Sequence, residues 1–274
     1  MAVVGSWQLP PVHLDVALKH LRIERLTLPL SSRSAGYTAE QFSRTAKAEL
    51  ERMYASGAVV DDEVAPLLAE ALGVLATPYL WVDSMWFPQV GSDHCWRALA
   101  VFTAGNRVVL GVQSPGETPQ RGGLVTVEVH ENAPLPQVLL GTLPPARPGG
   151  QGPARVPRSS FAHQGGPEDF ERATMLESAT PDRGSTGDRQ VRLYETIGRA
   201  PHQRIGQIAA NLRDQHGRRR RSKVVSWFDN PEPDGRYLNR IERGSSGEEV
   251  YAILPADART IGVEIDSLIA QVRS

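Results

Sequence analysis

The sequence contains a single cysteine, Cys95, and no apolar run that approaches the length of a membrane-spanning helix. One cysteine cannot form an internal disulfide or build a thiolate metal cluster, which favours a reducing compartment. The 30 basic and 31 acidic residues nearly cancel, so no overall attraction to nucleic acid or anionic membranes is expected. The first residues also lack the basic and continuous apolar regions of a signal peptide, which indicates a cytosolic location.

Motifs of the common enzyme classes are missing as well. We find no G-x-S-x-G, no Walker loop and no dinucleotide-binding glycine pattern. The seven histidines are scattered, and only Asp93, His94 and Cys95 place three potential metal ligands together. Adjacent residues on a strand point to opposite faces, which makes this triplet a poor chelate. We therefore expect a non-enzyme with no catalytic residues, no metal site and no cofactor.

What the sequence does contain is ordinary globular composition, with 40% apolar and 22% charged residues in 274. Thr38 and Gln41 form a capping-box pattern that begins a helix, which Gly57 ends. Asp61 or Asp62 is placed to cap the next helix, and we expect the two helices to form a hairpin. The inward positions expected on these two helices are Phe42, Ala46, Leu50, Met53, Tyr54, Val64, Leu67, Leu68, Ala71, Leu72 and Leu75. An earlier helix begins after two prolines and carries two neighbouring stripes, one of Val12, Val16 and His20 and one of Leu14, Leu18 and Leu21.

After residue 79 the period changes to that of strands. Short runs rich in β-branched and aromatic residues predict an antiparallel sheet, with a tight turn at Gly105 and Asn106. Residues 114–123 look too long and flexible for a two-residue turn, so we expect a protruding loop there. A short apolar helix should follow Pro134. The predicted strands cover residues 80–86, 97–104, 107–113 and 123–130.

The C-terminal part repeats this order of strands, proline and helix. Three strands are predicted at residues 223–229, 235–242 and 248–254, followed by a helix whose inward positions are Ile261, Ile265, Leu268, Ile269 and Val272. We interpret the order as a duplication with halves at residues 1–143 and 190–274, although a chance recurrence of a common arrangement remains open. Residues 144–189, rich in proline, glycine and arginine, should be an extended connector that contains a short helix at 169–178, and residues 193–210 look helical.

Four short elements between residues 204 and 237 occur in a fixed order. They are Gly206, Gln207 and Ile208, then Gly217 to Arg220, then Val225, Trp227 and Asp229, then Gly235, Arg236 and Tyr237. In this order they resemble the C-terminal signature of the EspG family, the cytosolic specificity chaperones of actinobacterial ESX (type VII) secretion systems. The opening and closing segments resemble the same family. We expect the signature residues Gly206, Gln207, Gly217, Arg218, Arg219, Trp227, Asp229, Gly235, Arg236 and Tyr237 to be structural.

The resemblance implies one α+β domain over residues 1–274, with a central antiparallel sheet flanked by helical bundles and two pseudo-symmetric halves. It also implies a chaperone that binds helical secretion substrates of PE–PPE or WXG100 type, shields their apolar tip and keeps them soluble for export. No nucleic acid partner, no membrane insertion and a monomer or weak homodimer are expected. A client-binding chaperone needs a preformed surface with a mobile rim. We place that rim at Ser114, Pro115, Gly116, Glu117, Thr118, Pro119, Gln120 and Arg121.

Two further interpretations concern charged residues. The basic run at residues 217–223 could anchor phosphates, so a nucleic-acid-binding regulator is the alternative function. Against it, the run has no interleaved aromatic residues and no accompanying DNA-binding motif. Asp229 and Arg236 stand on either side of a predicted turn, and we expect them to form an ion pair across a hairpin.

Overall fold

The computed structural model describes residues 2–32, 38–118, 120–161 and 186–274. The chain divides into two compact units: the first comprises residues 1–145, 204–224 and 258–274, and the second comprises 146–203 and 225–257. The described residues form six α-helices together with antiparallel strands. The predicted α+β class with an antiparallel sheet is therefore confirmed, and the duplication of two halves stays a prediction.

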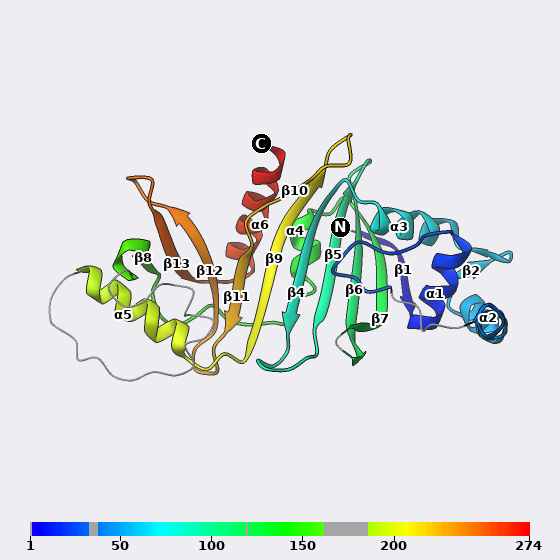
Figure 1. Cartoon of the computed structure of the whole chain (residues 1–274), viewed down its shortest axis with the longest axis horizontal. Coiled ribbons are helices and arrows are strands. Elements are labelled where there is room, and N and C mark those ends of the chain that lie inside the picture. Colours follow the sequence, from blue (N-terminus) through cyan, green and yellow to red (C-terminus); the bar gives the residue numbers. More distant parts are fainter. Residues whose placement is uncertain (1, 33–37, 119, 162–185) are drawn as a thin grey trace. The chain divides into compact units, whose positions relative to one another are not determined.

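Antiparallel strands form the framework of the first unit (Figure 1). Their order is β1, β7, β6, β5, β4 and β9, and the short strand β10 pairs with β9. The bounds are β1 Ala2–Leu9, β4 Leu80–Phe87, β5 Trp96–Thr103, β6 Arg107–Thr118, β7 Arg121–Glu131, β9 Arg204–Arg213 and β10 Arg219–Arg221.

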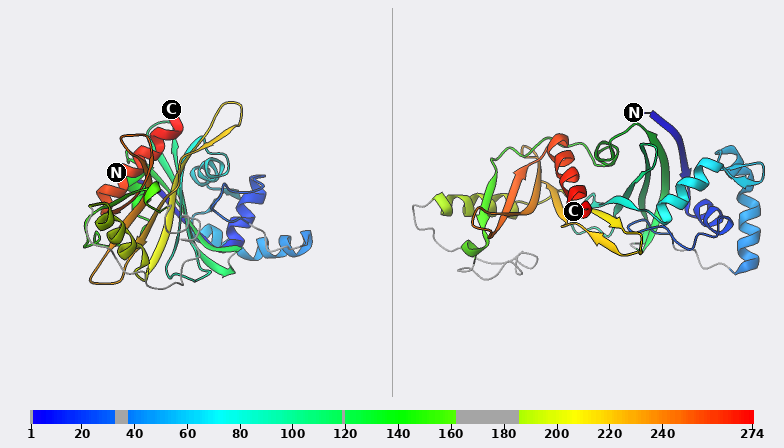
Figure 2. Two further views of the ribbon diagram at one scale, coloured as in Figure 1. Left: turned by 60° about the vertical axis from the view of Figure 1, so that its left-hand side comes forward. Right: turned by 90° about the horizontal axis from the view of Figure 1, so that it is seen from above.

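Successive strand residues alternate between the two faces of this sheet, and buried apolar side chains project from both. Helices cover both faces as a result. Trp81 and Leu99 join the core beneath α3, whereas Leu80 and Ala100 are buried on the face where α4 packs on β5 and β6 and α6 packs on β9 (Figure 2). The helices and the small hairpin of this unit are α1 Pro11–His20, α2 Ala39–Ala55, β2 Val59–Val60, β3 Glu63–Val64, α3 Pro66–Ala76, α4 Leu135–Leu140 and α6 Ala258–Arg273.

The second unit is a smaller antiparallel arrangement of β11, β12, β13 and β8 with helix α5 packed on β8 and β13. Its core contains Trp227 and Tyr237, both fully buried, and a group in which Phe161 makes edge contacts with Tyr194 and Tyr251. The bounds are β8 Ala154–Pro157, η1 Arg158–Phe161, α5 Thr186–Arg199, β11 Val225–Asp229, β12 Arg236–Arg243 and β13 Glu249–Pro255.

Several local predictions are confirmed. Thr38 and Gln41 exchange both bonds of a capping box at the start of α2, and Gly57 follows the helix with a φ of +67°. Gly105 and Asn106 both have positive φ in the turn between β5 and β6. The predicted strands and the helices after Pro134 and Pro255 are present, and all five inward positions of α6 are buried.

The predictions around the second and third helices are partly wrong. Asp61 and Asp62 do not cap α3: both have positive φ and form the turn of the β2–β3 hairpin, which separates α2 from α3 in place of a helical hairpin. Only Met53 is buried on α2, whereas Tyr54 is exposed, because the helix contacts α1 and β2 along part of its surface only. On α1, Leu14 and Leu18 of the second stripe are buried, whereas Val12 and Val16 of the first stripe are half-buried and His20 is exposed.

Three segments differ from their predicted conformation. Residues 2–9, for which no strand was predicted, form β1 at the edge of the sheet. Residues 204–210 are not helical but belong to β9, where small residues such as Ala209 and Ala210 are buried in a sheet strand paired with β4. Part of the predicted connector, residues 154–157, is β8, which pairs with β13 and buries Val156. The helix predicted at 169–178, with its anchors Phe170 and Met175, lies outside the described residues.

Candidate functional site

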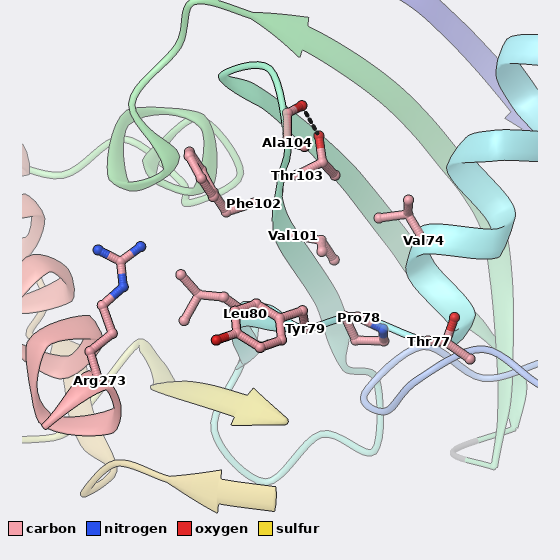
Figure 3. A pocket seen from close by; sticks show the side chains of 10 residues that line it. All are labelled: Val74, Thr77, Pro78, Tyr79, Leu80, Val101, Phe102, Thr103, Ala104 and Arg273. Atoms are coloured by element: carbon pink, nitrogen blue, oxygen red, sulfur yellow. Dashed lines mark hydrogen bonds between the residues drawn. The ribbon is translucent and has the colours of Figure 1, made fainter. Parts of the chain in front are cut away.

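The first unit carries an apolar pocket of about 390 Å³ at the end of the sheet where β4 begins and β5 ends (Figure 3). Tyr79 and Phe102 line it and keep 63% and 37% of their surface exposed. Walls this exposed do not enclose a small ligand, since small-molecule sites bury most of their occupant. The pocket is better suited to an apolar side chain of another protein. Its lining comprises Val74, Thr77, Pro78, Tyr79, Leu80, Val101, Phe102, Thr103, Ala104 and Arg273.

The polar groups of the pocket are few. Thr77 Oγ1 donates to the carbonyl of Gly73 at 3.1 Å, and Thr103 Oγ1 donates to the carbonyl of Ala104 at 3.3 Å, so both hydroxyls are already engaged. The guanidinium of Arg273, from the last turn of α6, makes no ion pair or hydrogen bond with any residue that the structure describes. The pocket therefore combines apolar walls with one uncompensated positive charge.

The predicted loop at residues 114–123 is instead the end of the β6–β7 hairpin. The two strands remain paired as far as Thr118 and Arg121, with irregular register around Pro115. The prediction of a long loop was wrong because bulges accommodate the proline, and because glycines let the strands approach closely: a Cβ on Gly116 would lie 2.0 Å from the carbonyl oxygen of Arg121.

The predicted contact residues are brought together at this hairpin end. Ser114, Pro115 and Gly116 are half-buried, whereas Glu117, Thr118, Gln120 and Arg121 are exposed; Pro119 lies outside the described residues. Hydrogen bonds fix the hairpin to the segment before α2, since the Gln113 amide donates to the Ser31 carbonyl at 2.8 Å and accepts from its N–H at 2.7 Å. The hairpin end is thus polar and anchored.

The pocket and the hairpin end lie at opposite ends of the same strands. Phe102 in the pocket pairs with Val108 at the start of β6, and the hairpin end is reached ten residues further along, at Thr118. At about 3.3 Å per residue the two are separated by roughly 30 Å. A binding partner that touches both would have to extend along the sheet.

The signature residues around the β11–β12 turn make internal contacts. Arg236 donates to both carboxylate oxygens of Asp229 at 2.6 and 2.9 Å and lies 4.3 Å from the centre of the Trp227 ring. The expected ion pair is thus present, and both side chains are almost completely buried. Gly235 passes close to the backbone of Pro148, where a Cβ would lie 2.6 Å from the carbonyl oxygen. These contacts support a structural role.

The signature residue Tyr237 belongs to a hydrogen-bonded group around Asp234. Its Oδ1 accepts hydrogen bonds from the hydroxyl of Tyr237 at 2.7 Å and from the N–H of Gly150 at 2.8 Å, and its Oδ2 accepts from Asn230 at 3.0 Å. Burial and the hydrogen bond to Asp234 raise the pKa of Tyr237 to about 12. Burial opposes ionisation of Asp234, but its hydrogen bonds outweigh this and lower its pKa.

The arginine run after Gly217 consists of a turn followed by a short strand. Gly217 has a φ of +78° in the turn, and Arg218 lies beside Asp214 at 3.9 Å, but Arg219 to Arg221 form β10. The remaining signature residues, Gly206 and Gln207, are in β9, with Gly206 buried and Gln207 exposed.

Within the described ranges no group of histidine, cysteine and acidic side chains is arranged to hold a metal ion. Cys95 is buried, and this burial raises the pKa of its thiol, which disfavours the reactive thiolate. None of the described helices combines the length and apolar composition of a membrane-spanning segment.

Sequence reasoning missed the pocket entirely. Its residues come from α3, β4, β5 and α6, and only their tertiary arrangement brings Tyr79, Phe102 and Arg273 together. The available signal was weak: Tyr79 directly follows Pro78, which ends a helix, and an aromatic residue in such a connection is not a motif.

Comparison with known proteins gives a strong structural likeness to a solved chaperone. EspG5 of Mycobacterium tuberculosis, a type VII secretion system chaperone solved in complex with the PE25–PPE41 dimer, has 17% identical residues and a TM-score of 0.65, covering 97% of this chain and 96% of that chain. HtdX of M. tuberculosis (10% identity, 92% and 98% of the two chains, TM-score 0.17) and a MaoC-like dehydratase of Phytophthora capsici (9%, 92% and 95%, 0.21) are so distant that nothing about this chain follows from them.

No curated protein sequence registers as a relative. The model of the EspG family, in contrast, matches residues 10–267, which is nearly the whole chain, and the likeness to EspG5 shows the same fold. The signature elements between residues 204 and 237 fall inside the matched range. The chain belongs to the EspG family.

Proposed function

We propose that this protein is a cytosolic chaperone of a type VII secretion system, which binds a helical substrate pair and keeps it soluble for export. The observation that supports this most is the family match over residues 10–267, together with the fold shared with EspG5. A PE–PPE pair is the first candidate client, because EspG5 is known in complex with such a dimer. A WXG100-type pair is the second candidate, and the chaperone itself acts as a monomer or weak homodimer.

The physical basis of the proposal is burial of an apolar patch. The pocket at Tyr79 and Phe102 is a preformed apolar depression, and interface energy concentrates where such depressions are filled by a partner's anchor residues. We assign the client's apolar tip to this pocket. The end of the β6–β7 hairpin, residues 114–121, is proposed as a polar contact at the far end of a client that extends along the sheet.

Co-expression of the tagged protein with the small helical secretion substrates encoded beside it, followed by size-exclusion chromatography, tests the function. A complex of defined size that keeps the substrates soluble is the expected result. Substrates that are insoluble alone and are not retained by the chaperone would refute the proposal.

Variants then locate the contact surface. Phe102→Asp should weaken the complex at least about tenfold, because a charge replaces an apolar anchor in the pocket. Val263→Asp is the matched control, since Val263 is 64% exposed on α6 and does not line the pocket. Glu117→Lys tests the hairpin end separately. Equal affinities for wild type and Phe102→Asp, at unchanged thermal stability, would exclude the pocket as the site.

A further inference from the structure

The arginine run of β10 is divided between the two faces of its strand. Arg219 and Arg221 both donate to Oδ1 of Asn211, at 2.7 and 3.0 Å from their nearest nitrogens, so they share one face of the β9–β10 hairpin. Arg220 stands between them and, by the alternation of strand residues, points to the other face. The run therefore does not present a continuous row of cations.

The charges on the face shared by Arg219 and Arg221 do not balance. Asp83 accepts two hydrogen bonds from Arg221, at 2.6 and 3.0 Å, and neutralises that arginine. Arg219 is bonded to the neutral amide of Asn211, and the guanidinium of Arg213 makes no ion pair or hydrogen bond with any described residue. Two of the three arginines on this face thus have no carboxylate partner among the described residues.

The two arginines without a carboxylate are direct neighbours. Arg213 and Arg219 stand opposite each other in the antiparallel pairing of β9 and β10, and both guanidinium groups lie over the ring of Trp81, at 5.9 and 5.1 Å from its centre. Stacking on an indole holds each cation in place, but like charges directly opposite on a sheet repel. Burial lowers the pKa of Arg219, and the charges of Arg221 and Arg213 add to this while Asp83 opposes it.

This pair lies beside the apolar pocket. The backbone N–H of Arg213 donates to the carbonyl of Tyr79 at 2.8 Å, and Tyr79 lines the pocket. Leu212, the residue before Arg213, is paired with Leu80, which also lines it. The uncompensated cations and the exposed apolar surface therefore belong to the same end of the sheet in the first unit.

We propose that Arg213 and Arg219 form a carboxylate-binding site, which receives an aspartate or glutamate side chain located beside the apolar tip of the client. The inference rests on the proposed chaperone function and specifies the client's chemistry at the same surface. Two adjacent guanidinium groups held on an aromatic ring suit one carboxylate, for which arginine has the matching donor geometry. A nucleic acid strand fits less well, because Arg220 points away and Arg221 is already neutralised by Asp83.

The test uses the client pair recovered by co-expression, with the affinity measured by calorimetry. Arg213→Gln should weaken the complex about tenfold or more, as expected when one partner of a buried charge contact is lost. Without client, the melting temperature of the Arg213→Gln variant should equal or exceed that of the wild type, because the substitution removes a charge that repels Arg219. Arg220→Gln is the matched control: it removes the same charge from the same hairpin on the opposite face, and the affinity should not change.

A reciprocal experiment identifies the client's carboxylate. Acidic residues near the client's apolar tip are replaced one at a time by Asn or Gln. One of these client variants should bind the wild-type chaperone more weakly than the unchanged client does, whereas its affinity for Arg213→Gln should not fall further. Equal affinities of Arg213→Gln and wild type would overturn the inference and leave the chaperone function intact. A lowered melting temperature of Arg213→Gln with unchanged binding would show a structural role. Salt-sensitive binding of duplex DNA or RNA that depends equally on Arg213 and Arg220 would favour the nucleic-acid alternative.

Discussion

Asp229 and Arg236 face each other across β11 and β12 and exchange two hydrogen bonds in an almost completely buried position. A buried ion pair is costly to assemble, but removal of one partner leaves a buried charge without compensation. The Trp227 ring beneath Arg236 fixes the guanidinium further. At this position the family signature therefore describes a structural lock of the second unit.

Replacement of either partner alone should strongly lower the free energy of unfolding. Replacement of both should lower it by less than the sum of the two single losses. We expect Asp229→Asn and Arg236→Gln each to lower the free energy of unfolding by about 3–5 kcal/mol. The double variant should lose less than the sum, with a coupling of about 1–3 kcal/mol. Urea denaturation of the wild type, the two single variants and the double variant measures these free energies. Strict additivity would show that the two side chains do not act as a pair.

The lowered pKa of Asp234 predicts that the stability of the protein falls in acid. Its pKa in the folded protein is lowered below its ordinary value of 3.8, so it contributes stability that is complete above that value and is lost as the pH falls through the folded pKa. We expect the urea midpoint of the wild type to fall more steeply below pH 3.8 than that of Asp234→Asn. The measurement is a denaturation series at decreasing pH, and parallel curves would contradict the assignment.

At the scale of elements, α2 is held by few buried side chains. Met53 is its buried residue, and contacts of charged and polar groups also join it to α1. His13 of α1 lies 3.1 Å from Glu49, and the ammonium of Lys19 lies 3.4 Å from the centre of the Phe42 ring. A helix with little buried surface depends more on its own ends. The capping box of Thr38 is therefore important for this helix.

Thr38→Ala should lower the free energy of unfolding by about 1 kcal/mol, because the backbone N–H of Gln41 loses the Thr38 hydroxyl as its acceptor. Helicity measured by circular dichroism should fall slightly in parallel. Ser43→Ala, at an exposed position within the helix, is the control and should be neutral or slightly stabilising. An equal loss in both variants would mean that the cap is not formed.

Helices, turns and strands could be predicted from the sequence where residue spacing and turn residues gave a strong local pattern. The capping box of α2, the turn at Gly105 and Asn106 and the strands of residues 80–130 could be predicted, because spacing and turn chemistry are encoded locally. β9 could not, because Ala209 and Ala210 favour a helix and only pairing with β4 makes them a strand. The pocket could not either, because its walls come from four separate elements.

At the scale of the whole molecule, the chain passes between the two compact units four times. The first unit needs three separate segments of the sequence: β9 completes the sheet beside β4, and α6 packs on α4 and β9. Neither unit is therefore a continuous stretch that could be cut out.

A fragment of residues 1–145 tests this directly. It retains β1 to α4 but loses the partners of β4 and of α4, so an unpaired strand edge and an apolar helix face become exposed. We expect it to aggregate or to show no cooperative unfolding, as judged by size-exclusion chromatography and circular dichroism, under conditions in which the full chain is folded. A monomeric fragment with a cooperative transition would contradict the interdependence of the three segments.

The position of α6 also has a consequence for timing during synthesis. The helix contributes Arg273 to the pocket and packs on strands and helices made much earlier, so the receptor surface is finished only after the ribosome has translated residue 273. A nascent chain that has not yet reached residue 273 lacks this wall of the pocket and cannot present the complete surface proposed for the client.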